Sequence, residues 1–539
     1  MNLATIIEGH PGAAVALRYG GRELTYGEVR AQAGAMRRHV GENRIVPGER
    51  VALLLPTSPA FVVAYFGILG SGAVAVPLNP ASPLAELERE LAMVTATAVL
   101  VGGDGSGELR GALEASGHRV WTMSQDGQID PAEARAGGTV EAPAADPAGA
   151  AAGGTPGPPI VDREPDAIAV LLFTSGTAGT PKAAMLTHAN LLANIEQMGL
   201  SVGLAVTAED VSVLVVPPFH ILGLNAVVGL QMFAGGRLVL VERFEPAAML
   251  ELLSSEAVTI LAAVPQLFAA LAAVPAAGAA EPPGEEVAGT GRSAGVGTAG
   301  ALASVRLACS GAAPLPLETA RAFEDRFGLP IWQGYGLTEA SPTVTFPDLS
   351  GPHRPGSVGR PLPGVELRIV DVDGHDVEAG DPGEIFVRGP NVFAGYLDDH
   401  EATARALDGG GWLHTGDVAA MDEDGSLTIV DRTKDLVIVS GFNVFPAEVE
   451  QVLEAHPGVA EAAVVGVPDA EHGEAVRAFV VPVPGSWPDD TEAPEGLTEA
   501  ELVRHSARLL ARYKCPSRVT FVRQLPHGLQ GKVVRRAVS

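Results

Sequence analysis

Short apolar runs alternate with amphipathic stretches along most of the chain, and no other feature constrains the fold as tightly. The runs have the length and β-branched content of buried strands, while the stretches between them space their apolar residues as helices do. The clearest runs are residues 51–55, 73–77, 167–173, 211–216 and 237–241. Buried strands separated by helices favour an α/β fold with substantially parallel sheet. We therefore predict a large N-terminal α/β region of several subdomains with mixed sheets.

A different pattern begins after Asp431. Shorter strands there alternate with two amphipathic helices and predict a small C-terminal α+β domain, of a size common among domains. The expected elements are strands at 436–440, 459–467, 475–483 and 518–522 and helices at 446–455 and 498–511. Three tracts rich in Ala, Gly, Pro or acidic residues lack periodicity and are predicted to be surface loops, at 141–160, 276–300 and 482–496.

The composition argues against several classes of protein. A chain of 539 residues is too long for one core. Its formal charge of −28, from 64 acidic and 36 basic residues, opposes binding to duplex DNA. The most apolar stretch, 61–76, is shorter than the about 20 residues of a spanning helix, so we predict a buried helix followed by a buried strand. The N-terminus lacks the pattern of a secretory signal and the two cysteines make no disulfide framework, so we expect a cytoplasmic protein.

Residues 171–190 carry the strongest chemical signal. A predicted buried strand runs into hydroxyl residues and glycines that are followed by Lys182. Glycines let backbone N–H groups converge on an anion, hydroxyls donate further hydrogen bonds and the lysine supplies charge, so phosphate is the expected ligand. The spacing differs from the common nucleotide loop because no glycine precedes Lys182, and a solvated turn is the alternative. The candidate phosphate-binding residues are Thr174, Ser175, Gly176, Thr177, Gly179, Thr180 and Lys182.

The loop TSGTAGTPK (174–182) resembles the phosphate loop of the adenylate-forming enzymes, which include acyl-CoA synthetases, adenylation domains of peptide synthetases and luciferases. It departs from that pattern in having Ala183 where glycine is usual. Further segments resemble the family's motifs in the family's order. They are PPFHILGLN (217–225), SGAAP (310–314), QGYGLTEASP (333–342), TGD (415–417), DRTKDLVIVSGFNVFP (431–446) and GK (531–532). The chain looks most similar to fatty-acyl and aryl acyl-CoA synthetases.

The resemblance implies a nucleotide site assembled from these segments. Tyr335 would offer an aromatic face to adenine, Asp417 a carboxylate to the ribose hydroxyls, and Glu339 an oxygen ligand for Mg²⁺ held against a triphosphate. Thr174 is expected to assist Glu339 at the metal, and Thr338 to donate its hydroxyl to phosphate. The remaining expected nucleotide contacts are Gly311, Ala312, Ala313, Gly334, Gly336 and Arg432.

The resemblance also divides the chain into an adenylation domain (1–431), a hinge (432–434) that contains Lys434, and a mobile C-terminal domain (435–539). Lys532 is the expected catalytic lysine, which bridges the substrate carboxylate and the α-phosphate. Gln530 replaces the small hydroxyl residue usual in its loop. Family members rotate the C-terminal domain between two half-reactions, and this rotation would replace Lys532 with the strand that carries the pantetheine-tunnel residues Ser440, Gly441 and Phe442.

His220 would gate the route from pantetheine to the acyl pocket. The residues expected to line that pocket by resemblance are Leu222, Gly223, Ala226 and Val227. They are small or aliphatic, and the segment has no Asp that would bind a substrate ammonium group. An apolar acid is therefore expected, with a medium- to long-chain fatty acid favoured over an aryl or cyclic carboxylate.

Together these features predict an AMP-forming acyl-CoA synthetase that uses ATP, Mg²⁺ and CoA. A carrier protein's phosphopantetheine is the alternative acceptor, and weak membrane association is compatible with a lipid substrate. Basic residues that could meet the 3′-phosphate of CoA are Arg477, Arg512 and Lys514. A non-catalytic nucleotide-binding relative is opposed by the joint presence of Glu339, Asp417 and Lys532.

Overall fold

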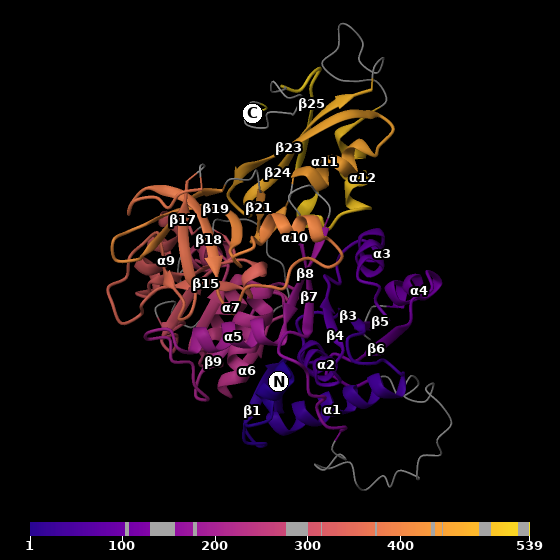
Figure 1. Cartoon of the computed structure of the whole chain (residues 1–539), viewed down its shortest axis with the longest axis vertical. Coiled ribbons are helices and arrows are strands. Elements are labelled where there is room, and N and C mark those ends of the chain that lie inside the picture. Colours follow the sequence, from indigo (N-terminus) through magenta and orange to yellow (C-terminus); the bar gives the residue numbers. More distant parts are fainter. Residues whose placement is uncertain are drawn as a thin grey trace, which may run out of the picture.

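The computed structural model describes residues 1–102, 107–129, 157–175, 181–275, 300–313, 315–371, 374–432, 437–444, 446–483, 497–526 and 538. Figure 1 shows three sheet-containing regions in the lower part of the molecule, coloured from indigo to orange, and a smaller unit above them that contains the last described residues. The predicted architecture, a large mixed α/β region with a smaller C-terminal domain, is confirmed.

The first sheet is nearly all parallel and follows the predicted alternation of strands and helices. Its order is β6-β5-β3-β4-β7-β8, and only the last pair is antiparallel. The strands are β3 (Arg50–Leu54), β4 (Val74–Pro77), β5 (Ala98–Gly102), β6 (Val120–Met123), β7 (Ile168–Ser175) and β8 (Pro181–Thr187). The helices that accompany them are α1 (Tyr26–Glu42), α2 (Pro59–Gly70), α3 (Leu84–Met93) and α4 (Gly107–Ala115).

The second sheet is parallel except for its β1–β2 edge, in the order β13-β12-β11-β9-β10-β1-β2. Its strands are β1 (Val15–Tyr19), β2 (Arg22–Thr25), β9 (Val211–Leu214), β10 (Arg237–Leu240), β11 (Ile260–Ala263), β12 (Leu307–Ser310) and β13 (Ile331–Gln333). Its helices are η1 (Leu3–Ile7), α5 (His188–Gly199), η2 (Leu222–Gly229), α6 (Leu230–Ala234), α7 (Pro246–Ser255), α8 (Pro265–Ala273) and α9 (Leu317–Phe327).

The third sheet is entirely antiparallel, in the order β14-β15-β16-β20-β19-β18-β17. Its strands are β14 (Tyr335–Gly336), β15 (Thr343–Phe346), β16 (Ser357–Pro361), β17 (Glu366–Val370), β18 (Pro382–Arg388), β19 (Leu413–Met421) and β20 (Leu427–Arg432). The short helices η4 (Thr338–Ala340) and α10 (His400–Ala406) lie between these strands in sequence.

The C-terminal unit contains every strand and helix predicted for it and one more strand. The sheet order is β22-β21-β24-β23, with β25 beside β24. The elements are β21 (Val437–Val439), β22 (Phe442–Val444), α11 (Pro446–Glu454), β23 (Val459–Asp469), β24 (Gly473–Pro482), α12 (Glu499–Ala507), η5 (Arg512–Lys514) and β25 (Arg518–Phe521). The unpredicted strand, β22, pairs with β21 in a hairpin that turns at Ser440 and Gly441.

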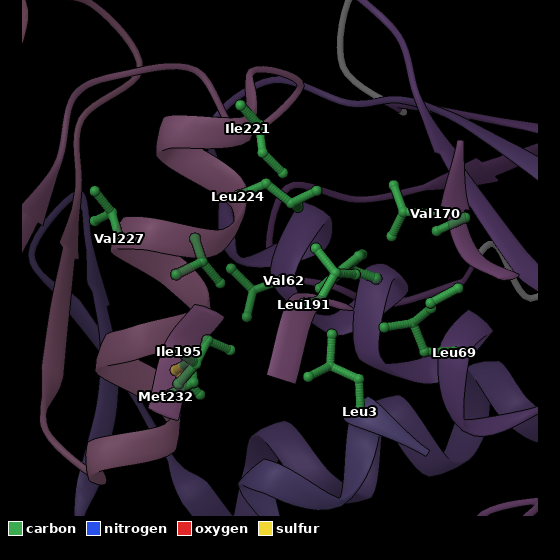
Figure 2. Close-up of a cluster of buried hydrophobic side chains, with 14 of the residues drawn as sticks. Leu3, Val62, Leu69, Val170, Leu191, Ile195, Ile221, Leu224, Val227 and Met232 are labelled. Carbon is green, nitrogen blue, oxygen red and sulfur yellow. The ribbon is translucent and has the colours of Figure 1, made fainter. Parts of the chain in front are cut away.

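The main core joins the first two sheets through three apolar helices. The stretch 61–76 forms the buried helix and buried strand expected, α2 and β4, with every residue of α2 buried. Figure 2 shows Val62 of α2 in one cluster with Leu191 and Ile195 of α5 and Leu224 of η2, while Leu69 of α2 lies on the opposite side of this cluster. Each large aliphatic side chain buried in this way contributes about 1.5–3 kcal/mol. These contacts fix η2, which forms a wall of the site.

Sequence signals at helix starts explain why the elements begin where they do. Thr25 and Glu28 form a reciprocal capping box at α1, and Thr187 and Asn190 form another at α5. The described end of the tract 141–160 is irregular and partly exposed, as predicted, and it lies against α1, where Arg37 donates a hydrogen bond to the carbonyl of Pro158. The rest of that tract and nearly all of 276–300 lie outside the described residues.

Candidate active site

A cavity of about 580 Å³ is lined by residues of all three N-terminal sheets and of the C-terminal unit. Its walls come from β7 and β8 of the first sheet, β9, β11 and β12 of the second, and β14, β15 and β19 of the third. Phe442, Tyr513 and Lys514 add the contribution of the C-terminal unit. The carboxyl ends of parallel strands therefore meet an antiparallel sheet here, a position where ligand sites of α/β proteins are common.

One end of the cavity has the groups expected for a nucleoside. The hydroxyl of Tyr335 donates a 2.8 Å hydrogen bond to Oδ2 of Asp417, which joins β14 to β19. Gly311, Ala312, Gly334 and Gly336 also line the cavity. A Cβ at Gly336 would collide with the carbonyl of Pro342, so only glycine fits there. Ala313 is described but is not part of the cavity wall.

Glu339 lies beside a second set of polar groups suited to phosphate. The hydroxyl of Tyr396 donates a 2.7 Å hydrogen bond to Oε1 of Glu339, and the Nζ of Lys182 lies 5.0 Å from the centroid of the Tyr396 ring. Burial and the adjacent Glu339 carboxylate raise the pKa of Tyr396. The phenol therefore stays protonated and remains a donor. Thr174 pairs with Lys182 across the β7–β8 ladder, and Thr174, Thr338 and Lys182 all line the cavity.

This donor set fits Mg²⁺ that is held mainly by substrate phosphates. Magnesium in such sites takes one or two carboxylates together with phosphate oxygens and water. Glu339 supplies one carboxylate and Thr174 one hydroxyl beside it on the cavity wall. No group of three or more His, Cys, Asp and Glu side chains able to hold a metal by themselves occurs among the described residues.

An aromatic cluster also lines the cavity. The ring centroid of Phe442 lies 6.2 Å from that of His220, 6.3 Å from Phe219 and 4.4 Å from Tyr513. Burial lowers the pKa of His220 to about 4, so its imidazole is neutral at pH 7. Its Nδ1 accepts a 3.3 Å hydrogen bond from the N–H of Leu222, which leaves the proton on Nε2.

The tip of the β21–β22 hairpin packs against the N-terminal region beside this cluster. Gly441 has a φ of +82°, and a Cβ there would lie 2.7 Å from Cγ1 of Val264. Ser440 contacts Nδ1 of His472 at 3.0 Å, while Gln266 of α8 donates to the carbonyl of His472 at 3.3 Å. The structure thus places Phe442 next to the predicted gate His220, with the other two predicted tunnel residues, Ser440 and Gly441, at the adjoining hairpin turn.

The other end of the cavity is apolar and uncharged. Leu222, Ala226 and Val227 line it from η2, and Ala262 and Cys309 line it from the facing strands. Gly223 differs from expectation: it lies off this wall, because the helical turn directs it toward the carbonyls of Val216 and Pro217. Further lining residues are Met198, Leu204, Val206, Ser212, Leu230, Gln231, Ile260, Leu307 and Phe346.

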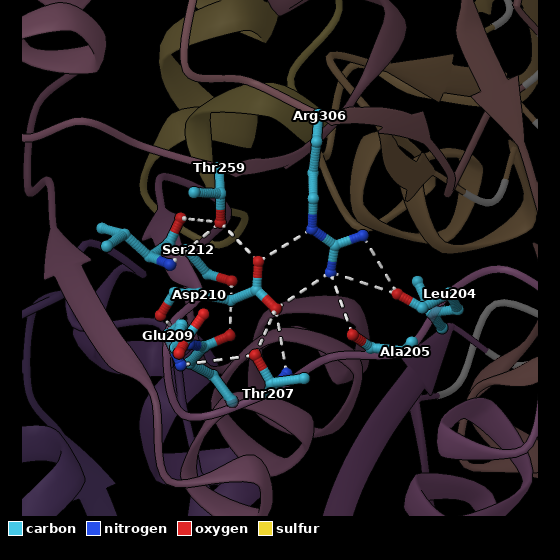
Figure 3. A network of polar contacts seen from close by, with 10 residues as sticks. Leu204, Ala205, Thr207, Glu209, Asp210, Ser212, Thr259 and Arg306 are labelled. Atoms are coloured by element: carbon cyan, nitrogen blue, oxygen red, sulfur yellow. Dashed lines mark hydrogen bonds and ion pairs between the residues drawn. The ribbon is translucent and has the colours of Figure 1, made fainter.

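A polar network fixes the loop that contributes Leu204 and Val206 to this end. Figure 3 shows Asp210 at its centre, with Arg306 bridging to the loop. Arg306 donates to Asp210 at 2.8 and 2.9 Å and to the carbonyls of Leu204 and Ala205 at 3.1–3.2 Å. Burial works against the Asp210 carboxylate, but hydrogen bonds from Arg306, Thr207 and Thr259 outweigh it and lower the pKa of Asp210.

Comparison with known proteins identifies the family. Two family signatures match, "AMP-binding enzyme" over residues 3–397 and "AMP-binding enzyme C-terminal domain" over residues 448–532. The chain belongs to the AMP-binding enzyme family. The expectation of an AMP-forming acyl-CoA synthetase is confirmed at this level, because curated relatives aligned over nearly the whole chain are named CoA ligases or synthetases.

Individual relatives differ in the acids that they are named for. A feruloyl-CoA synthase of Amycolatopsis is 35% identical to this chain, and the alignment covers 97% of this chain and 95% of the relative. A long-chain-fatty-acid–CoA ligase of Yersinia pestis is also 35% identical, with coverages of 91% and 84%. Among solved structures, the amide bond synthetase McbA of Marinactinospora thermotolerans is 31% identical, covering 100% and 99% of the two chains with a TM-score of 0.80.

Several residues predicted for this AMP-binding enzyme lie outside the described residues. They are Gly176, Thr177, Gly179, Thr180, Lys434 and Lys532. The side chains of Ser175 and Arg432 are likewise outside them, although the backbones of Ser175 and Arg432 pair with Pro181 and Asp417 respectively. The roles of these residues and the boundaries 1–431, 432–434 and 435–539 stay predictions.

The structure also corrects the expectation for Lys514 and adds residues that the sequence did not reveal. Lys514 is not available for a CoA phosphate, because it is buried between Glu86 and Glu448. Tyr396 and Tyr513 line the cavity but carry no pattern that separates them from ordinary core tyrosines. Within the part of the chain that the structure describes, every helix is too short or too polar to cross a bilayer.

Proposed function

We propose that this AMP-binding enzyme activates an apolar carboxylic acid, first of all a medium- to long-chain fatty acid, and transfers the acyl group to CoA. The observation that carries the proposal is one continuous cavity with an uncharged apolar end, an aromatic cluster around His220, and a polar end around Asp417 and Glu339. An acid bound with its tail among Leu222, Ala226 and Val227 has its carboxylate directed toward the phosphate-binding residues.

In the first step the acid's carboxylate oxygen attacks the α-phosphorus of ATP, and the bond to pyrophosphate breaks. Lys182 and the 174–180 loop bind the phosphates, Tyr335 and Asp417 hold the nucleoside, and Lys532 bridges the carboxylate and the α-phosphate. Glu339 and Thr174 would hold Mg²⁺, which would supply positive charge beside the triphosphate. Positioning and electrostatic stabilisation are the main contributions in phosphoryl-group chemistry of this kind.

In the second step the thiol of CoA forms a bond to the carbonyl carbon of the acyl-adenylate. The bond to the AMP oxygen breaks, AMP leaves with both electrons, and the thiol proton goes to solvent. Neutral His220 carries its proton on Nε2, so it can donate a hydrogen bond but is too weakly basic near pH 7 to take the thiol proton. Phe442 beside it closes the cavity against water.

An aryl acid is the second candidate, and a specific observation favours it. Ser212 and Gln231 are polar residues in the otherwise apolar wall, and the Ser212 hydroxyl donates a 2.6 Å hydrogen bond to Gln231. The Ser212 oxygen can still accept a hydrogen bond, for example from a phenol. A relative at 35% identity is named for such an acid. A carrier-protein acceptor and a cytoplasmic location remain predictions from the sequence.

Pyrophosphate release from ATP and Mg²⁺, across a panel of fatty, aryl and amino acids with and without CoA, tests the proposal. We expect continuous turnover with fatty acids of eight or more carbons in the presence of CoA. A preference for hydroxylated aryl acids that disappears in Ser212→Ala would establish the second candidate. A single stoichiometric burst that CoA does not convert to turnover would point to a carrier protein, and no release with any acid would refute the proposal.

A further inference from the structure

A buried ion cluster joins the N-terminal region to the C-terminal unit. Nζ of Lys514, on η5, lies 2.7 Å from Oε1 of Glu86 on α3 and 3.0 Å from Oε1 of Glu448 on α11. The side chains of Lys514, Glu86 and Glu448 are only 7%, 2% and 4% exposed. Figure 1 shows α3 directly beneath α11 and α12. The contact between Lys514 and Glu86 therefore exists only while the two units are docked as they are here.

The cluster is acidic as well as buried. Glu90 lies one turn after Glu86, and burial together with the charge of Glu86 raises its pKa to about 8. Arg89 also crosses the interface, where it donates a 3.0 Å hydrogen bond to the carbonyl of Leu509, and its charge partly offsets the rise in the pKa of Glu90. Burial alone would lower the pKa of Lys514. The nearby Tyr513, Glu448 and Glu86 outweigh this effect, so the pKa of Lys514 is raised. Burial also raises the pKa of Glu448. At pH 7 the lysine is therefore charged and lies against Glu86 and Glu448, with Glu90 protonated nearby.

Removing one member of such a cluster is costly. The second carboxylate oxygens of Glu86 and Glu448 are buried and have no hydrogen-bond partner among the described residues. Without Lys514 both carboxyl groups would stay desolvated in the docked state and would lose their hydrogen-bonded cationic partner. Undocking would return Glu86 to water. Removing Lys514 therefore destabilises the docked arrangement selectively.

The same short helix supports the aromatic cluster at the cavity. Tyr513 precedes Lys514 on η5 and stacks on Phe442 at 4.4 Å, and Phe442 faces His220. Glu86, Glu90 and Lys514 also line the cavity, on the side of the C-terminal unit. An ion pair that fixes η5 against α3 thus also fixes the residues that meet His220.

We propose that Lys514 is a positioning residue for thioester formation: with Glu86 and Glu448 it forms an interdomain ion cluster that holds Tyr513 and Phe442 against His220. The inference rests on the proposed function, in which the second step uses the docking of the β21–β22 hairpin seen here, whereas the first step uses Lys532. Loss of the cluster is therefore expected to slow the second step and to spare the first.

Separate measurement of the two half-reactions tests this role. Acid-dependent exchange of labelled pyrophosphate into ATP reports the first step, and single-turnover conversion of a supplied acyl-adenylate to acyl-CoA reports the second. In Lys514→Met we expect thioester formation to fall at least tenfold while exchange changes less than twofold. Arg508→Met, an exposed change at the end of α12, is the matched control and is expected to affect neither.

A variant that replaces the whole cluster distinguishes positioning from direct contact with substrate. In Glu86→Leu/Glu448→Met/Lys514→Met no charge is left unpaired, and well-packed apolar residues can substitute for a buried ion cluster. We expect this triple variant to recover most of the thioester rate. Equal loss of both half-reactions in Lys514→Met, no loss, or no recovery in the triple variant would each overturn the proposal. Exchange by the unmodified enzyme tests the proposed function independently, so the two failures are distinguishable.

Discussion

Gly441 offers a substitution whose effect on each half-reaction can be worked out from the structure. Its Cα lies where the hairpin tip touches the N-terminal region, and an added Cβ would stand 2.7 Å from Cγ1 of Val264. Overpacking of this kind costs about 1–3 kcal/mol. If that cost falls only on the docked arrangement, Gly441→Ala slows thioester formation by about five- to 150-fold, since about 1.4 kcal/mol corresponds to a factor of ten.

A second cost of the same substitution acts on the whole fold. The φ of +82° at Gly441 lies in the left-handed region, where a residue with a Cβ loses about 1–2 kcal/mol. This strain is local to the hairpin and lowers the unfolding midpoint of the C-terminal unit whether or not it is docked. Thermal unfolding therefore measures the backbone cost, and the ratio of the two half-reaction rates measures the contact with Val264.

Val264→Ala provides the matched control because it removes the methyl groups that the new Cβ would meet. In the double variant Gly441→Ala/Val264→Ala, we expect thioester formation to return to within about threefold of the Val264→Ala rate, while the loss of thermal stability persists. The rate of pyrophosphate exchange should stay within twofold of the unmodified enzyme's rate in Gly441→Ala, in Val264→Ala and in the double variant. Thioester formation that is unaffected in Gly441→Ala, or a loss that Val264→Ala does not relieve, would refute the reasoning.

Three further predictions address other parts of the site. Lys532→Ala should nearly abolish pyrophosphate exchange but spare thioester formation from a supplied acyl-adenylate; equal loss of both would refute its role. Glu90 has a pKa of about 8 when docked and an ordinary value near 4.5 when exposed, so docking binds a proton and weakens as pH rises toward 8. The ratio of wild-type to Glu90→Gln thioester rates should therefore fall between pH 6 and 8 and then level off, whereas a constant ratio would contradict the docking role. Arg306→Met frees the Leu204 loop, so kcat/KM should shift severalfold toward longer acids, and the unfolding midpoint should fall because Asp210 loses its ion-pair partner; an unchanged acid profile would show that the network does not shape the pocket.

Much of the fold could be predicted because the signals for its strands and helices lie in short stretches of the sequence. The strands β3, β4, β7, β9 and β10 are short apolar runs. Parallel strands have this composition because both of their faces are buried. The antiparallel third sheet was harder to predict from the sequence, because its strands are half-exposed and vary in spacing. The strand β22 has only three residues, and its pairing with β21 depends on a turn at Ser440 and Gly441. Ser-Gly is a dipeptide typical of turns, but the strand predicted at 436–440 included Ser440.

The site could be predicted where it consists of contiguous motifs and not where it depends on distant pairs. Tyr335 and Asp417 were both expected, but their hydrogen bond required the β14–β19 arrangement. Tyr396 was missed because only the fold brings its hydroxyl to Glu339. Lys514 was one of three basic candidates for the 3′-phosphate of CoA, because CoA ligases often place basic residues near that group. Its partner Glu86 lies 428 positions away, beyond the reach of any pattern in the sequence.

The most direct test of the central claim follows the oxygen atoms of the acid. A fatty acid labelled with ¹⁸O in both carboxylate positions is incubated with enzyme, ATP, Mg²⁺ and CoA, and the products are analysed by mass spectrometry. Attack on the α-phosphorus followed by thiolysis predicts one ¹⁸O in AMP, one in acyl-CoA and none in pyrophosphate. Label in inorganic phosphate, or AMP without label, would contradict an acyl-adenylate intermediate and the account built on it.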